Sequence, residues 1–271
     1  MKMIKTSFAA LALLMSVNVP AQTYDVGQAV QRGPFENKVS ATRGVTSGAV
    51  TNGGFEINGG SGTNSISGWT VVDQAGGSGT WYALSGTTTP DSSSTVPVPS
   101  GGTFAAMTDQ TGPGSHVLYQ DITVPASGGT LSFDFFINNQ APAFIVPSPA
   151  TLDYTSGPNQ QFRADIMSTT AGDFDVGAGV LANIYQTNEG DPLTNGGYVN
   201  VSFNLGAFAG QTVRLRFAET DNQSFLNAGI DNVRIVGPPV AVPVAGPFGL
   251  IVLTLLLLVA AGIGFRIRAT G

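Results

Sequence analysis

The sequence predicts an all-β domain of two packed antiparallel sheets, flanked by an N-terminal signal peptide and one C-terminal transmembrane helix. Three observations lead to this fold class. Short runs of β-branched and aromatic residues recur from Asn52 onward, separated by clusters of Gly, Pro, Asn and Ser. No segment between 52 and 240 keeps a helical period of apolar residues. Charged residues make up only 10% of the chain, so Gly, Ser, Thr and Asn fill the polar positions, as in a turn-rich β-protein.

Ten segments are expected to be strands, and some of them alternate apolar and polar residues as a half-buried strand does. After Leu131, the phenylalanines face the same way as the leucine, while Ser132 and Asp134 face the other way. In a later strand, Arg214 and Arg216 are expected on the solvated face. The expected strands are 68–73, 80–84, 103–108, 117–124, 130–138, 161–168, 180–186, 198–205, 212–219 and 229–236.

Two long connections separate these strands. Residues 85–102 are almost all Ser, Thr, Pro and Gly, which predicts an exposed loop. Residues 140–159 contain four prolines, which exclude a central strand. Loops of this length are either disordered or functional.

The N-terminus has the three parts of a secretory signal peptide. Lys2 and Lys5 precede an apolar stretch too short to span a bilayer, and Val19-Pro20-Ala21 offers a cleavage site after Ala21. The alternative is an N-terminal membrane anchor. Residues 1–21 are therefore expected to be removed, and 22–51 to form a loosely packed arm before the domain at 52–236.

The C-terminus predicts a membrane span. Residues 248–265 form an uncharged apolar run of 18 residues, about 27 Å long as a helix at ~1.5 Å per residue. Arg266 and Arg268 follow it, which by the positive-inside rule places 266–271 in the cytoplasm and the preceding chain on the far side. The proline-rich segment 237–247 is a stiff spacer between domain and membrane.

This tail also resembles the PEP-CTERM and IPTL-CTERM sorting signals of bacteria, in which a short proline motif, a membrane helix and a basic cluster follow one another. The corresponding residues here are Pro243, Gly246, Pro247, Arg266 and Arg268, although a Pro-Glu-Pro core is absent. The resemblance implies that an exosortase-like enzyme cuts the tail and that the protein is released or attached to the cell surface. The alternative is a permanent single-span anchor in the inner membrane, facing the periplasm.

Charge and cysteine content exclude several functions. All 17 acidic residues lie within 22–247, and no Lys or Arg occurs from 52 to 162, so the surface repels phosphate backbones and nucleic-acid binding is excluded. The absence of cysteine excludes thiol catalysis and cysteine-ligated zinc. His116 is the only histidine and is expected at the surface, and no Gly-x-Ser-x-Gly motif is present for a hydrolase triad.

The two ends of the domain carry short motifs. Asn52-Gly53-Gly54-Phe55-Glu56 opens it, Gly68-Trp69 follows, and Asp231-Asn232-Val233 closes it. They resemble the ends of galactose-binding-like jelly rolls, the fold of many secreted carbohydrate-binding modules. The resemblance implies a jelly-roll sandwich and one structural Ca²⁺, shared by Glu56 and Asp231 with Asn52 as a weaker ligand. Gly-rich loops allow the carbonyl oxygens that Ca²⁺ also needs to converge. The alternative is that the two carboxylates accept backbone N–H groups or pair with an arginine.

A glycan site needs flat aromatic rings beside amide or carboxylate groups that bind hydroxyls. Trp81, Tyr82 and Tyr119 are candidate rings, and Asn139 and Gln140 are candidate amides at a strand end. The alternative for each ring is a place in the core.

Acid–base catalysis by exposed carboxylates is the least favoured function. Asp121, Asp134 and Asp165 are candidates, but acidic residues on a sheet face are usually solvated or paired, here with Arg163 or Arg216. The sequence thus predicts a non-enzymatic, exported cell-surface or extracellular-matrix protein, for example of a biofilm. The alternatives are a carbohydrate-binding module that recognises an extracellular polysaccharide and, less favoured, a secreted glycoside hydrolase.

Overall fold

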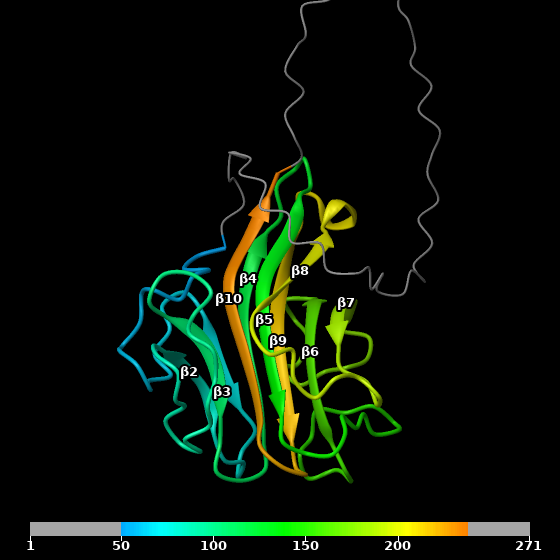
Figure 1. Ribbon diagram of the computed structural model, residues 1–271. Helices are drawn as coiled ribbons and strands as arrows, with labels where there is room; N and C mark the ends of the chain where they lie inside the picture. The colour runs from blue at the N-terminus through cyan, green and yellow to red at the C-terminus, as the bar shows by residue number, and fades with distance from the viewer. Residues whose placement is uncertain (1–49, 238–271) are drawn as a thin grey trace, which may run out of the picture. The chain divides into compact units, whose positions relative to one another are not determined.

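The computed structural model describes residues 50–237, which form a sandwich of two antiparallel sheets (Figure 1). The predicted signal peptide, nearly all of the 22–51 arm, the spacer from 238, the membrane span and the basic tail lie outside the described residues. Within 50–237, no helix is long and apolar enough to cross a membrane.

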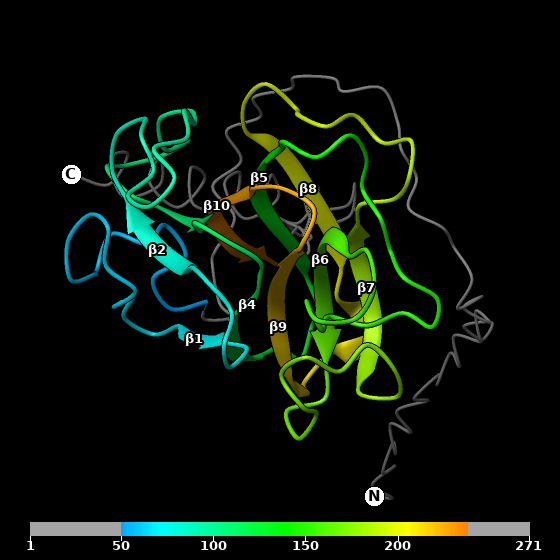
Figure 2. The same cartoon turned by 90° about the horizontal axis from the view of Figure 1, so that it is seen from below.

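Each sheet has five strands, and the two sheets face each other as two rows when the sandwich is seen from below (Figure 2). Sheet 1 has the order β1 (Thr70–Asp73), β4 (Gly114–Thr123), β9 (Thr212–Asp221), β6 (Gln160–Met167) and β7 (Val180–Gln186). Sheet 2 has the order β2 (Thr80–Leu84), β3 (Ala105–Asp109), β10 (Leu226–Val236), β5 (Thr130–Asn139) and β8 (Val199–Asn204). One short 3₁₀ turn, η1 (Gly206–Phe208), precedes β9.

The strand order is that of a jelly roll with one extra strand at an edge of each sheet. From β3 to β10 the chain passes repeatedly between the sheets, and the two rows β3-β10-β5-β8 and β4-β9-β6-β7 result. β1 is added beside β4, and β2 beside β3. The predicted two-sheet antiparallel sandwich is therefore confirmed, and all ten expected strands are present within a few residues of their expected bounds.

The core fills the space between the sheets. Alternate residues of β5 and β9 point inward, and Phe133 meets Phe217 edge-on with ring centroids 5.0 Å apart. Phe135 stacks on Phe162 across the sandwich at 4.5 Å. Aromatic pairs of this kind add about 0.5–1.5 kcal/mol beyond the area that they bury, so these pairs hold the centre of the two sheets together.

The prediction that Arg214 and Arg216 face solvent is wrong. Both lie on the outer face of sheet 1, but Arg216 is completely buried and Arg214 is only 8% exposed. The loop 168–179 covers this face, and Arg216 Nη1 donates to the carbonyl oxygens of Asp173 and Asp175, both at 2.7 Å. The arginines are thus the contacts through which this loop is held.

Asp165 is the counter-charge on the same face. It is completely buried and accepts two hydrogen bonds from Arg163, at 2.7 and 2.8 Å. It also accepts from Arg216 Nη2 at 2.5 Å. The predicted pairing of Asp165 with these arginines is confirmed, and the buried charges are compensated by hydrogen-bonded partners, as buried ions must be.

The loop between β2 and β3 is largely exposed, as predicted, and part of it folds onto sheet 2. Residues 87–96 form a small hairpin over the outer face of sheet 2, and Val96 packs there against Met107. Asp109 is buried beneath it and accepts from the backbone N–H groups of Asp91 and Ser92, at 2.6 and 3.0 Å. A buried carboxylate therefore fixes a loop whose composition suggested exposure.

Replacing Asp165 by alanine is expected to destabilise the domain by about 3–5 kcal/mol, because two buried guanidinium groups lose their counter-charge. Equilibrium urea unfolding measures the change. Glu189→Ala serves as the control: this side chain is exposed, so its loss is expected to change the free energy of unfolding by less than about 0.5 kcal/mol. Equal effects of the two substitutions would show that the Asp165 pairs do not hold the outer face.

Candidate functional site

The structure brings Glu56 and Asp231 to the same segment of chain, the loop that leads into β3. Glu56 Oε1 accepts from the backbone N–H groups of Thr103 and Phe104, at 2.8 and 3.0 Å. Asp231 Oδ2 accepts from the N–H of Gly101 at 2.9 Å. Motifs at the two ends of the domain thus hold a common loop, with charge-assisted hydrogen bonds.

The contact between Glu56 and the loop leaves no space for a side chain at position 102. A Cβ atom on Gly102 would lie 2.1 Å from Glu56 Oε1, and Gly102 has a φ of +59°. The opening motif and the last strand, β10, are also tied directly, since Val233 N–H donates to the Gly53 carbonyl at 2.8 Å. Gly53 is therefore required by the close approach of the Val233 carbonyl, and Gly102 by that of the Glu56 carboxylate.

Asn52 has a different role from the one predicted. Its Oδ1 accepts from Ile57 N–H at 3.0 Å, and its Nδ2 donates to the carbonyls of Ile57 and Ser67, both at 2.9 Å. All its polar atoms are used within the 52–67 loop. The side chain therefore fixes that loop. Its Oδ1 accepts a hydrogen bond from Ile57 N–H, whereas the oxygen of a metal ligand would face a cation.

The remaining oxygens of the two carboxylates differ. Both Asp231 oxygens accept backbone N–H groups, the second from Asn232 at 2.6 Å, whereas no described residue donates to Glu56 Oε2. Burial raises the pKa of the Asp231 carboxyl, and these N–H groups act against that shift. Glu56 and Asp231 thus accept hydrogen bonds from backbone N–H groups, which is the alternative to calcium binding that sequence analysis gave.

Asp134 lies directly opposite Asp231 in the β5–β10 pair. Ser100 Oγ is 2.8 Å from one carboxylate and 3.1 Å from the other. The amide nitrogens of Asn200 and Asn232 each donate to Asp134 at 2.8 Å. Polar donors therefore separate two like charges that would otherwise destabilise the strand pair, and Asp134 does not pair with an arginine as the sequence suggested.

The five predicted ligand residues do not form one site. Trp81 is completely buried in the main core, because it lies on the inner face of β2. Its ring has no exposed face, so its prediction as a stacking platform is wrong. Asn139 is also buried, and its amide bonds Ala141 N–H, Gln160 Nε2 and the Ala143 carbonyl at 2.9–3.0 Å.

Tyr82 and Gln140 both reach the 87–96 hairpin on the outer face of sheet 2. Tyr82 is half-buried, and its hydroxyl donates to Asp91. Gln140 is exposed, and its Nε2 donates to Ser94 Oγ at 3.0 Å. The structure thus gathers one predicted ring and one predicted amide around one loop.

Tyr119 lies on the other sheet. It is half-buried on the outer face of sheet 1, with the Arg214 guanidinium carbon 3.7 Å from its ring centroid. This cation–π contact occupies one face of the ring. Arg214 also bonds Asp121 at 2.8 Å and Asp173 at 2.9 Å, so the predicted acid–base candidate Asp121 is part of an ion-pair network.

Sequence analysis did not identify a row of ionisable side chains that lies on the inner face of sheet 1. Asp73, His116 and Glu219 lie side by side on β1, β4 and β9. The expectation of a surface histidine is wrong, since His116 is completely buried. Its Nδ1 lies 2.8 Å from Asp73 Oδ1, and its Nε2 lies 2.9 Å from the Ser78 carbonyl oxygen.

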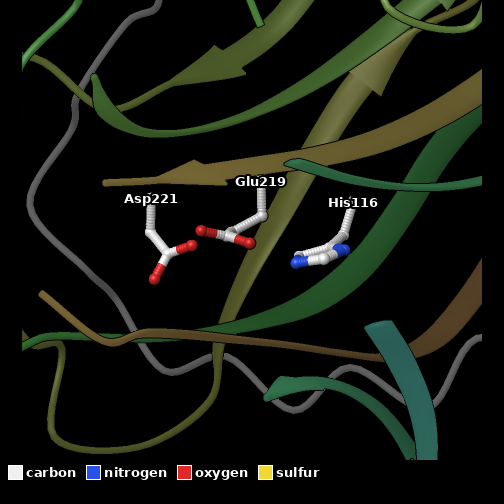
Figure 3. Close-up of side chains that lie close together, drawn as sticks. All are labelled: His116, Glu219 and Asp221. Carbon is white, nitrogen blue, oxygen red and sulfur yellow. The ribbon is translucent and has the colours of Figure 1, made fainter. Parts of the chain in front are cut away.

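Glu219 and Asp221 continue this polar region at the end of β9 (Figure 3). Glu219 is completely buried and neither of its oxygens has a hydrogen-bond partner. Burial, followed by the charges of Asp221 and Asp73, raises the pKa of its carboxyl well above the usual value. Burial also raises the pKa of Asp221 to about 7, although Gln110 Nε2 and Gly114 N–H donate to it at 2.8 and 3.1 Å.

One signal in the sequence points to these two residues. Val213, Leu215 and Phe217 alternate on the core side of β9. The same alternation continued for four more residues places Glu219 and Asp221 inside the sandwich.

No family model and no curated protein matches the chain. Among solved structures, the K1 cleaved adhesin domain of Lys-gingipain from Porphyromonas gingivalis W83 is 13% identical, with a TM-score of 0.42, over 72% of this chain and 100% of that one. TmCBM61 in complex with β-1,4-galactotriose is 12% identical, with a TM-score of 0.41, over 71% and 100%. The Stig cyclase Fisc from Fischerella sp. TAU is 16% identical, with a TM-score of 0.43, over 71% and 99%. No site residue of this chain follows from these remote similarities.

Proposed function

We propose that this chain is an exported, non-enzymatic protein of the cell surface or extracellular matrix, whose β-sandwich is its binding domain. The observation that carries the proposal is the order of its parts. A signal-type segment at 1–21 precedes the sandwich, and a proline-rich spacer at 237–247 leads to an uncharged run and two terminal arginines. Such an order exports the sandwich and retains it at a membrane until the tail is processed.

The sandwich holds its long loops without disulfides. It contains no cysteine, so disulfides do not stabilise it. Carboxylates and arginines, all buried except Glu56, instead fix the loops at 87–96, 100–104 and 168–179. These contacts supply the restraint that disulfides give to many exported domains.

The carboxylates also support a binding function over a hydrolytic one. Asp121 and Asp165 accept hydrogen bonds from guanidinium groups. Asp134 is engaged by Ser100 and two asparagine amides, so each of the three acid–base candidates has a structural partner.

The tail is expected to be a sorting signal that an exosortase-like enzyme cuts. Intact mass of the protein from its producing cells, fractionated into membrane, envelope and medium, is expected to end within 237–247, with the protein outside the inner membrane. A mass that includes Arg268, found only in the membrane, would instead identify a permanent anchor. A chain that retains Met1 to Ala21 in the cytoplasm would contradict export altogether.

Recognition of an extracellular polysaccharide is the second candidate function, and the gathering of Tyr82 and Gln140 around the 87–96 hairpin favours it. The hairpin is rich in Ser and Thr. A partly exposed ring beside amides and hydroxyls is the combination that binds sugar C–H faces and hydroxyl groups.

Tyr82→Ala is expected to abolish retardation of the protein in affinity gels that contain neutral polysaccharides, because the sugar loses its stacking surface. Tyr82→Phe keeps the ring and loses only the hydroxyl bond to Asp91, so its retardation is expected to stay within about threefold of the original. Tyr119→Ala, on the opposite sheet, is the matched control. If Tyr119→Ala abolishes retardation and Tyr82→Ala does not, the site lies on sheet 1.

Calcium at Glu56 and Asp231 remains part of the proposal. Glu56 Oε2, to which no described residue donates, is the carboxylate oxygen left for a cation. Both Asp231 oxygens and Asn52 Oδ1 already accept N–H groups. Fewer oxygen atoms are therefore free to bind Ca²⁺ than the resemblance implies.

If Ca²⁺ binds there, EGTA is expected to lower the melting temperature, since a ligand of the native state stabilises it by about 2.7 kcal/mol at a hundredfold excess over Kd. Glu56→Gln is expected to remove the difference between Ca²⁺ and EGTA. An identical melting temperature of the original protein in both buffers would show that the two carboxylates act only as loop caps.

A further inference from the structure

One atom each of His116, Glu219 and Asp221 lie within 4.8 Å of one another in the interior of the sandwich. Glu219 and Asp221 are alternate residues of β9 and share its inner face, and His116 is the partner of Glu219 on β4. In Figure 3, Glu219 lies between the imidazole and the second carboxylate. We infer that these three side chains form a binding site for a divalent transition-metal ion such as Zn²⁺.

The unpartnered carboxylate of Glu219 is the second observation that points to a ligand. The other buried carboxylates of the described chain all accept hydrogen bonds, namely Asp109, Asp165, Asp221 and Asp231. Neither oxygen of Glu219 does. A buried polar group without a partner is unfavourable and rare in folded proteins, and a cation between Glu219 and Asp221 would supply the missing partner.

Gln110 provides a further oxygen at the same place. Its Nε2 donates to Asp221 Oδ2 at 2.8 Å, while its own Oε1 is buried and has no partner. An amide oxygen of a side chain that contacts Asp221 extends the set of oxygen atoms available to a metal.

The local charge balance also favours a cation. Three carboxylates, those of Asp73, Glu219 and Asp221, surround one imidazole. The arginines of β9, Arg214 and Arg216, occupy the outer face of the sheet, where Asp121 and Asp165 pair with them. His116 is therefore the only basic side chain of β4 and β9 on this side, and a divalent ion would balance the two carboxylates of β9.

The ligand types select the metal. An imidazole nitrogen combined with two carboxylates suits Zn²⁺ or Mn²⁺ better than Ca²⁺ or Mg²⁺, which prefer oxygen alone. Asp73 engages Nδ1 and the Ser78 carbonyl engages Nε2, so a metal on Nε2 would replace the hydrogen bond to Ser78. A carboxylate on the other ring nitrogen is the usual support of a metal-binding histidine.

Gly114 lies so close to Nε2 that no side chain fits between them. A Cβ atom on Gly114 would lie 2.4 Å from Nε2 and 2.5 Å from the Ser78 carbonyl oxygen. A metal on Nε2 displaces the hydrogen that this nitrogen shares with Ser78, so binding releases a proton. The cluster lies where β4 begins and β9 ends, and the Asp73 side chain beside His116 is 35% exposed.

The test uses the full-length chain, purified without a histidine tag in detergent and stripped of metal. Equilibrium dialysis against Zn²⁺ alone, followed by elemental analysis, is expected to find one Zn²⁺ per chain that a large excess of Ca²⁺ does not displace. Zn²⁺ is also expected to raise the melting temperature. Glu219→Gln, which keeps the shape and removes the charge, is expected to lose both effects, whereas Glu56→Gln keeps both.

A second variant covers the case in which Glu219→Gln does not fold. Asp73→Asn changes a partly exposed support of His116, and it is expected to weaken Zn²⁺ binding by roughly 10–100-fold. The proposal is overturned if the original protein takes up neither Zn²⁺ nor Mn²⁺ in stoichiometric amount. It is also overturned if Zn²⁺ uptake is equal in the original protein and in folded Glu219→Gln. In that case Glu219 is a buried, protonated acid.

Discussion

Carboxylates, most of them buried, hold the long loops of this sandwich against its sheets, and the arrangement of both outer faces depends on them. Asp109 fixes the 87–96 hairpin, Glu56 and Asp231 fix the segment before β3, and Asp165 holds the arginines that bind the 168–179 loop. Hydrogen bonds with a charged partner are roughly twice as strong as neutral ones. A chain without disulfides thereby gives irregular loops defined positions, and the backbone N–H groups of these loops find acceptors without regular secondary structure.

The strands could be predicted from the sequence because their signal is local. Apolar and polar residues alternate in β5 and β9, and clusters of Gly, Pro, Asn and Ser separate the segments. This pattern predicts that the segments are β-strands. The alternation shows which side chains face away from the core, but it does not show whether a loop covers that outer face. Arg214 and Arg216 were placed in solvent for this reason, and the folding of the Ser/Thr-rich hairpin onto sheet 2 was not foreseen. Both points concern contacts between segments far apart in the chain, which one sequence does not contain.

The candidate site residues also differ in how well the sequence predicts their positions. Glu56 and Asp231 were singled out from short motifs, and the structure brings both to one loop. Trp81 was proposed as a platform from its residue type alone, although its inner-face position buries it. The inner row was missed because a charged residue at the end of a strand is normally exposed. Only the cross-strand register shows that Asp73, His116 and Glu219 are neighbours.

The positions of the two proposed sites limit what each can do. The 87–96 hairpin with Tyr82 lies on the outer face of sheet 2, whereas the His116 cluster lies on the inner face of sheet 1. Core side chains such as Trp81 and Phe217 fill the space between the sheets. A metal in that cluster would therefore not reach a glycan on the hairpin, and protein atoms would surround it as in a structural zinc site. It would join β4 to β9 and stabilise the sandwich, a role that suits a binding domain and requires no catalysis.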